Sequence, residues 1–213
     1  MLPMNSVRLL GLVALFDLMA ILILYPHLDL FSVGYLVIST GLAVLQAIVS
    51  KQFSTSGEVQ RLFYAKEIDP IWDKCVPILG LLELPVFFEY AHLRFLPALL
   101  NMPLQTSGLI LAVLGTGWLL WVDAYLVREF PIHYRRAAPM TSGPYRHVRH
   151  PRYIGLLATR LALPLIFGSV LGWGLAFAWF LLIRRRAHLE EQYMTNQFGR
   201  AYTDYARHAF GIL

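Results

Sequence analysis

The sequence predicts an all-α polytopic membrane protein, and three observations support that fold class. Hydrophobic residues make up 57% of the 213 residues and charged residues only 15%, with a mean hydropathy of +0.56. Long apolar runs recur along the chain, and most of the 18 basic residues cluster beside them. Soluble domains average about 25% charged residues, and the single Cys75 rules out an intrachain disulfide. An ordinary soluble globule, a disordered chain and a disulfide scaffold are therefore excluded.

A membrane-spanning helix needs about 20 predominantly apolar residues. The first, second and fourth apolar runs qualify, whereas the third carries two glutamates and also fits a buried or tilted helix. The first run lacks a small-residue cleavage site behind it, so we interpret it as a retained helix rather than a signal peptide. The runs are residues 9–24, 31–50, 77–91, 109–127 and 154–183.

The last run, residues 154–183, is longer than one span and has arginines on both flanks. Basic flanks favour the cytoplasmic side, so this segment should leave and return to the same face. Pro164, Gly168 and the two following glycines supply a turn in its middle. We therefore predict about six membrane segments, the last two forming a short helical hairpin, with both termini cytoplasmic. Helix-forming residues 184–197 then predict a cytoplasmic C-terminal helical cap.

The densest group of chemically useful side chains is residues 143–153, which combine three arginines, two histidines and two tyrosines. Pro151 suits the first turn of a helix, which places His150 at a helix N-terminus where an anion is favoured. The alternative interpretation is a basic patch that contacts lipid headgroups, with Tyr145 and Tyr153 as interfacial anchors. The pattern by itself leaves these two readings evenly matched.

A second group lies in residues 184–205, with four arginines, Glu190, Glu191 and three tyrosines. Taken alone it is typical of a solvated helix with internal ion pairs. The predicted hairpin, however, brings residues 153 and 184 to the same membrane face, so the two groups should be neighbours. Their cations, carboxylates and aromatic faces fit a zwitterionic, aromatic cofactor held beside a lipid-facing cavity.

Several segments resemble the C-terminal signature of isoprenylcysteine carboxyl methyltransferases and their prokaryotic relatives. The resemblance covers roughly residues 107–208, and phospholipid N-methyltransferases, small-thiol S-methyltransferases and sterol reductases share parts of this region. It divides the chain into N-terminal membrane helices, residues 1–106, with no assignable motif, and a methyltransferase-like region, residues 107–213. The matching segments are Thr141–Tyr145, Arg149–Gly155, Glu190–Glu191 and Phe198–Gly199 with Tyr202 and Tyr205.

The resemblance implies S-adenosylmethionine as the methyl donor, bound at the cytoplasmic face. A glutamate can accept the donor's ammonium, a helix N-terminus or arginine can hold its carboxylate, and a tyrosine face can stack on adenine or lie near the sulfonium. No glycine-rich Rossmann loop is present, and no spacing marks a metal site. The expected cofactor-binding residues are Tyr145, Arg149, His150, Tyr153, Glu190, Glu191 and Tyr202.

The leading acceptor, by resemblance, is the carboxylate of an isoprenylcysteine-like molecule that enters from the bilayer. A carboxylate is ionised at pH 7 and needs an arginine to orient it, for which Arg160 and Arg184 are the candidates. A phospholipid amine or a small thiol would instead need a base, and Glu191 or His188 can serve. Arg160 also has a structural interpretation, as the partner of Glu83 or Asp123.

Two further function classes stay open at the level of sequence. An NADPH-dependent sterol-type reductase would give no methylated product, and a non-enzymatic membrane protein would use its basic face to bind anionic lipids. Nucleic acid is not an expected partner, because the basic residues lie beside apolar runs rather than over a soluble surface.

Overall fold

The computed structural model describes residues 6–25, 27–54, 69–135 and 138–211. Within them, every regular secondary-structure element is a helix. One isolated bridge, between Val148 and Phe210, is the exception. The α-helices are α1 (Ser6–Leu24), α2 (Leu30–Ser54), α4 (Pro70–Leu81), α5 (Glu83–Phe88), α6 (Met102–Arg135), α7 (Pro151–Phe167), α8 (Val170–Phe198) and α9 (Arg200–His208). Short turns of other helix types are η1 (Glu89–Leu93), η2 (Pro97–Leu99) and η3 (Gly143–Arg146).

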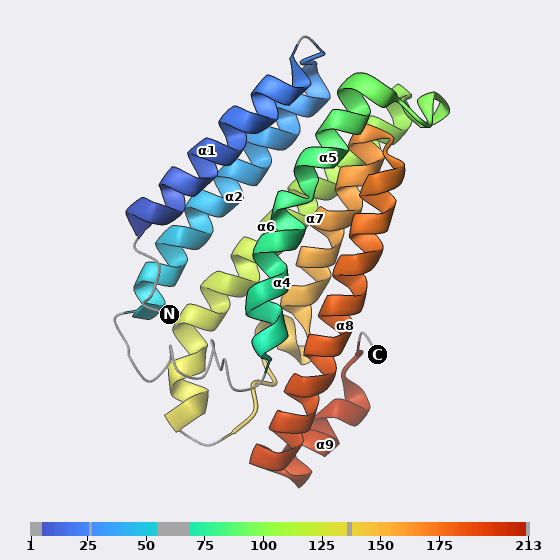
Figure 1. The fold of residues 1–213 in the computed structure, drawn as a ribbon. Helices are drawn as coiled ribbons and strands as arrows, with labels where there is room; N and C mark the ends of the chain where they lie inside the picture. The colour runs from blue at the N-terminus through green and yellow to red at the C-terminus, as the bar shows by residue number, and fades with distance from the viewer. Residues whose placement is uncertain (1–5, 26, 55–68, 136–137, 212–213) are drawn as a thin grey trace.

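The long helices lie side by side as a bundle, with α1 and α2 forming a pair along one side (Figure 1). One described helix is both long and apolar enough to cross a membrane, over Met102–Glu129. Leu10–Leu24 and Leu30–Leu45 are apolar but shorter. The all-helical fold is therefore confirmed, while the number of membrane segments and the cytoplasmic placement of the termini stay predictions.

The predicted hairpin is formed by α7 and α8, which pack against each other around a two-residue turn. Gly168 ends α7 with a φ of 53°, a left-handed conformation that glycine adopts without steric cost. Ser169 then caps α8 by accepting a hydrogen bond from the Gly172 amide at 2.8 Å. Pro164 lies inside α7 and does not contribute to the turn.

The third apolar run is interrupted in the structure, because α4 ends at Leu81 and α5 begins at Glu83. Both of its glutamates are buried and both have partners. The Glu89 carboxylate accepts hydrogen bonds from the amides of Val170 and Leu171, at 2.8 and 2.9 Å, and from the Ser169 hydroxyl. An acidic side chain from η1 thus satisfies the first amides of α8, which a membrane interior would otherwise leave unpaired.

Small residues let α6 and α7 approach closely, and this is the most extensive helix contact in the fold. A Cβ atom on Gly155 would lie 2.8 Å from Leu119 Cγ and 3.1 Å from the Gly115 carbonyl oxygen. Because α7 begins at the group predicted to carry the chemistry, this contact also fixes that group relative to α6.

Replacing Gly155 by alanine is expected to destabilise the protein, because the added methyl group has no space between α6 and α7. We expect a loss of about 1–3 kcal/mol in the free energy of unfolding, measured by thermal melts in detergent. Gly174→Ala is the matched control, since nothing lies within 4 Å of a Cβ atom there. Equal melting temperatures for the two variants would contradict the close packing.

The C-terminal cap is present, but its first helix is a continuation of the hairpin. α8 runs without a break from Val170 to Phe198, so the stretch predicted to begin at residue 184 is its second half. Gly199, with a φ of 53°, separates α8 from α9. The proposed cofactor residues of α8 therefore sit on a rigid extension of the second hairpin arm.

Candidate functional site

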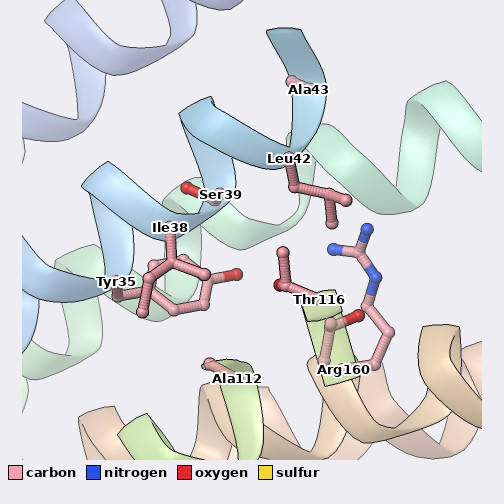
Figure 2. A pocket seen from close by; sticks show the side chains of 9 residues that line it. Tyr35, Ile38, Ser39, Leu42, Ala43, Ala112, Thr116 and Arg160 are labelled. Atoms are coloured by element: carbon pink, nitrogen blue, oxygen red, sulfur yellow. The ribbon is translucent and has the colours of Figure 1, made fainter. Parts of the chain in front are cut away.

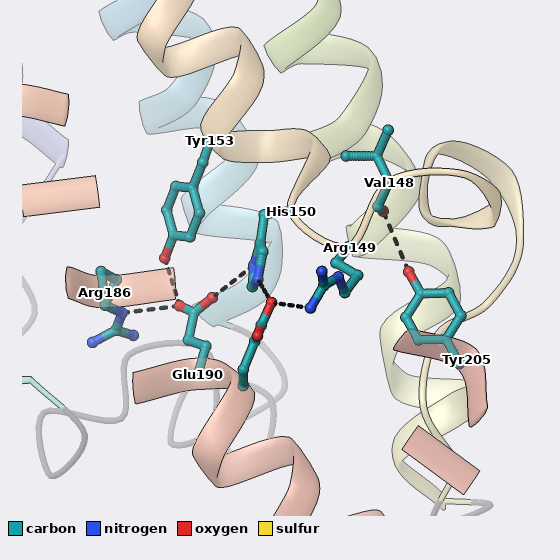
Figure 3. A network of polar contacts seen from close by, with 8 residues as sticks. Val148, Arg149, His150, Tyr153, Arg186, Glu190 and Tyr205 are labelled. Carbon is teal, nitrogen blue, oxygen red and sulfur yellow. Dashed lines mark hydrogen bonds and ion pairs between the residues drawn. The ribbon is translucent and has the colours of Figure 1, made fainter. Parts of the chain in front are cut away.

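The two predicted groups of side chains meet at one end of the bundle (Figure 3). The segment that precedes α7 and the first turn of α7 supply Arg149, His150 and Tyr153. The second half of α8 supplies Arg186, Glu190 and Glu191. The hairpin turn folds α8 back beside α7, so residues 37 and 41 positions apart in the sequence share one polar network.

Glu190 joins Tyr153 of α7 to Arg186 of α8. Its Oε1 accepts hydrogen bonds from the Tyr153 hydroxyl at 2.6 Å and from Arg186 Nε at 2.9 Å. The Tyr153 and Arg186 side chains are buried, whereas the Glu190 side chain is 31% exposed. Glu190 is thus held in one orientation by two donors and still faces open space.

His150 connects the two glutamates. Its Nε2 lies 2.9 Å from Glu191 Oε1, and its Nδ1 lies 3.8 Å from Glu190 Oε2. An ionised carboxylate only accepts hydrogen bonds, so Nε2 carries the proton in the pair with Glu191. The imidazole is buried and stacks on the Tyr153 ring, with the centroids 5.7 Å apart. As predicted, His150 occupies the N-cap position of α7 and Pro151 the first helical position.

Arg149 joins Glu191 to the C-terminal segment. Its Nη1 donates to Glu191 Oε1 at 2.9 Å, and its Nε donates to the Ala209 carbonyl oxygen at 3.1 Å. The Arg149 amide donates to the Phe210 carbonyl oxygen, and the Phe210 amide donates to the His147 carbonyl oxygen, each at 2.8 Å. The residues after α9 therefore hold the backbone directly before His150.

Tyr205 of α9 reinforces the same segment. Its hydroxyl donates to the Tyr145 carbonyl oxygen at 2.6 Å, with the Val148 carbonyl oxygen at 3.3 Å. Burial raises the pKa of Tyr205 to about 12, against the lowering effect of the Arg149 guanidinium. The phenol thus keeps its proton, and its role as donor, throughout the neutral pH range.

Replacing Tyr205 by phenylalanine is expected to loosen residues 145–150 without altering the glutamates. Because one well-formed hydrogen bond is lost, we expect a decrease of about 1 kcal/mol in the free energy of unfolding. Chemical denaturation in detergent measures this change. Tyr193→Phe is the control, since its hydroxyl makes no hydrogen bond with any described residue. An equal loss in both variants would show that the Tyr205 hydroxyl does not hold residues 145–148 in place.

The other predicted site residues lie outside this network. The Tyr145 ring packs against Val122, Leu126 and Met140, so its contribution is the backbone carbonyl. Tyr202 is buried beside Tyr205, with the ring centroids 5.9 Å apart. Burial and the Glu191 carboxylate raise the pKa of Tyr202.

The two arginines predicted to orient an acceptor lie in different environments. Arg160 forms an ion pair with Glu83 of α5, and its guanidinium carbon lies 4.6 Å from the centroid of the Trp179 ring. Arg184 is exposed and makes no ion pair with any residue in the described part of the chain. Groups of three or more metal-ligating side chains are also absent from the described residues.

Two residues of the site were not predicted from the sequence. Arg186 forms with Glu190 the i,i+4 ion pair that is typical of a solvated helix, and this spacing gives no sign that Tyr153 shares the same carboxylate oxygen. Trp72 of α4 is partly buried and packs against the main hydrophobic core. Its ring centroid lies 5.9 Å from that of Tyr153 and 6.3 Å from that of Trp179, so Trp72 also adjoins the site. No local signal around residue 72 could have indicated this contact.

The comparison with protein families identifies a related region. The family model described as phospholipid methyltransferase matches residues 99–201. The matched region contains α6, α7, α8 and every side chain of the His150–Glu190–Glu191 network. This family belongs to the same broad group of membrane methyltransferases as the isoprenylcysteine enzymes, so the match indicates a membrane methyltransferase. No curated protein and no solved structure matches the chain.

Proposed function

We propose that the protein transfers a methyl group from S-adenosylmethionine to the amine of a membrane phospholipid. The observation that carries this proposal is the network of His150, Glu190 and Glu191, which lies at the start of the predicted membrane hairpin and inside the matched region. The acceptor enters from the bilayer, and the cofactor binds at the cytoplasmic end of the bundle.

The donor set of the network fits S-adenosylmethionine. Glu190 Oε2 and Glu191 Oε2 accept no hydrogen bond from the described residues, so each can receive a positively charged group. The N-terminus of α7 favours a carboxylate, and the partly buried Trp72 ring, which lies beside Tyr153, offers an aromatic surface for a base. When bound, the cofactor supplies an electrophilic methyl group on its sulfonium.

The pairing of the arginines favours an amine acceptor over a carboxylate. Arg149, Arg160 and Arg186 are each already paired with a glutamate, so none of them is free to orient an acceptor carboxylate. A lipid amine needs the opposite, an anionic site that takes its proton. The partly exposed carboxylates of Glu190 and Glu191 supply this, and Glu191 is our choice for the proton acceptor because His150 and Arg149 hold its other oxygen.

The second candidate acceptor is the carboxylate of an isoprenylcysteine-like molecule. It is favoured by Arg184, whose exposed guanidinium has no ion-pair partner among the described residues. Residues 141–155 also resemble the corresponding segments of enzymes with that activity. In this case Arg184 would orient the acceptor, and no base would be required.

The experiment has two stages and uses the purified protein in lipid nanodiscs. Calorimetry first compares S-adenosylmethionine with NADPH, and label from the methyl group is then sought in phosphatidylethanolamine, a prenylcysteine and a small alkyl thiol. We expect saturable binding of S-adenosylmethionine and label in phosphatidylethanolamine.

Every other result identifies a competing function. Label in the prenylcysteine or the thiol would replace the acceptor while keeping the chemistry. NADPH binding without S-adenosylmethionine binding would indicate a sterol-type reductase. Binding of neither compound by folded protein would leave a non-enzymatic lipid-binding membrane protein.

A further inference from the structure

Helix α6 gives a depth scale for the bundle, because its residues Met102–Glu129 are long and apolar enough to cross a membrane. Ala112 and Thr116 lie near the middle of this 28-residue span. Together with Arg160 of α7 they line a pocket of about 110 Å³ between α2, α6 and α7 (Figure 2). The level of this pocket is therefore the middle of the predicted membrane.

The segment before α7 lies beside the predicted cytoplasmic end of the same span. The hydroxyls of Tyr125 and Ser142 are 2.6 Å apart, and the Trp118 indole donates to the Pro151 carbonyl oxygen at 2.7 Å. Tyr125 is nine residues beyond Thr116, or about 14 Å along the helix axis. Half of a typical hydrocarbon core is about 15 Å thick, so this segment lies at the boundary between lipid tails and headgroups.

The C-terminal segment, residues 205–211, is held at the same level. Figure 1 shows α9 folding back from the far end of α8 toward the bundle. The Phe210 amide donates to the His147 carbonyl oxygen, and the Phe210 carbonyl oxygen accepts from the Arg149 amide, each at 2.8 Å. These two bonds form the isolated bridge to Val148. Because backbone hydrogen bonds join the two stretches of chain, Phe210 shares the depth of the segment before α7.

Phe210 presents an apolar ring on the outside of the protein. The residue is 69% exposed, whereas the neighbouring Ala209 and the Tyr202 side chain are buried. Amphipathic segments at a membrane surface bury such side chains about 5–10 Å into the boundary between headgroups and tails. At the level of the bridge, lipid is therefore a favourable neighbour for the ring.

The surface around the bridge is basic. Asp204 is the acidic side chain of α9, and its ion pair with Arg207 at 3.3 Å is largely exposed and contributes little. Basic side chains beside an apolar anchor are typical of contact with an anionic membrane surface. Four exposed basic side chains lie within three residues of one end of the bridge: Arg146, His147, Arg207 and His208.

We propose that the end of α9 is a membrane-contact surface: Phe210 enters the predicted cytoplasmic leaflet, and the four basic side chains contact anionic lipid headgroups. None of these five side chains is part of the network that contains His150, so the contact is independent of the proposed methyl transfer. It would hold the backbone before His150 in place, through the hydrogen bonds that Phe210 makes with His147 and Arg149.

Site-directed spin labelling in lipid nanodiscs tests the depth of Phe210. Cys75 is the single cysteine of the chain, so Cys75→Ala gives a background in which one new cysteine at a time carries the label. Phe210→Cys is compared with Leu15→Cys, exposed on the apolar helix α1, and with Ala201→Cys, exposed at the start of α9. The relaxation of each label by oxygen, divided by its relaxation by a neutral nickel chelate, reports how deep the label lies.

We expect the oxygen-to-nickel ratio at position 210 to approach that at position 15 and to exceed that at position 201 at least about threefold. A ratio at position 210 equal to that at position 201 would show that the side chain faces water, and would overturn the proposal. Low accessibility to both reagents would also overturn it, because it would indicate a protein contact, such as a second copy of the chain.

The same label tests the preference for anionic lipid. Nanodiscs of phosphatidylcholine are compared with nanodiscs that also contain phosphatidylglycerol. We expect the ratio at position 210 to be about twofold to fivefold higher with phosphatidylglycerol, and the double variant Arg146→Gln, Arg207→Gln to remove this difference.

The matched control is the double variant Arg128→Gln, Arg200→Gln, which removes the same charge from exposed positions on α6 and at the start of α9. The control should keep the difference between the two lipids. Equal ratios in the two lipids without either double substitution would overturn the anionic contact, and so would an equal effect of the two double variants.

Discussion

Replacing Glu190 by glutamine is expected to reduce methyl transfer at least about a hundredfold. The amide oxygen can still accept from Tyr153 and Arg186 in place of Oε1, but the NH2 group then takes the place of Oε2, where it cannot receive a positively charged group as a carboxylate does. Calorimetry with S-adenosylmethionine should show at least about a tenfold weaker binding constant.

The control for this prediction is Asp204→Asn, which also replaces a paired carboxylate by its amide. Asp204 and Arg207 are 66% and 76% exposed, and an ion pair of that kind contributes little to stability. Methyl transfer and cofactor binding should both be unchanged in the control. Wild-type binding of S-adenosylmethionine by Glu190→Gln would remove Glu190 from the cofactor site.

Replacing Glu83 by leucine is expected to cause the largest loss of stability. Removal of the carboxylate leaves the Arg160 charge without its ion-pair partner inside the predicted membrane hairpin, and the buried Tyr35 hydroxyl loses its acceptor. Breaking a buried ion pair by deleting one partner costs about 3–5 kcal/mol. Thermal and denaturant unfolding in detergent should both show a loss of this size.

The double variant Glu83→Leu, Arg160→Met is expected to recover most of that stability, because no unpaired charge remains in the interior. A double-mutant cycle with the Arg160→Met single variant measures the coupling between the two residues. Additive losses, with the double variant as unstable as the sum of the singles, would show that the pair does not act as a unit.

The hairpin illustrates how much of the fold could be predicted from sequence. Two paired helices could be predicted from the length of the apolar run 154–183 and its arginine flanks. Gly168 indicated the turn between them, because glycine tolerates the left-handed conformation that the turn requires. The break between α4 and α5, in contrast, has no such local signal. Glu83 and Glu89 weakened the third run as a membrane segment, yet each carboxylate is satisfied by residues about 80 positions away.

The candidate site shows the same division. His150, Tyr153, Glu190 and Glu191 were expected to be neighbours, and the hydrogen bonds among them confirm that they are. Arg160 was expected either to act on an acceptor or to pair with Glu83 or Asp123. In the structure Arg160 forms its ion pair with Glu83. Asp123 pairs with Arg152 instead, with Oδ1 2.8 Å from Nε. Charge alone could not choose, since either acidic residue would neutralise an arginine.

The sequence by itself determined the helical class and the closeness of the two polar groups, and its resemblance supplied the methyltransferase chemistry. These properties follow from composition, periodicity and local turn residues, all of which are encoded over short distances along the chain. Only the tertiary structure decided that Trp72 lies beside Tyr153, that α9 binds the segment before His150, and that α2 lines a pocket together with Arg160. Such contacts depend on the positions and rotations of whole helices, which side chains from every part of the chain set together.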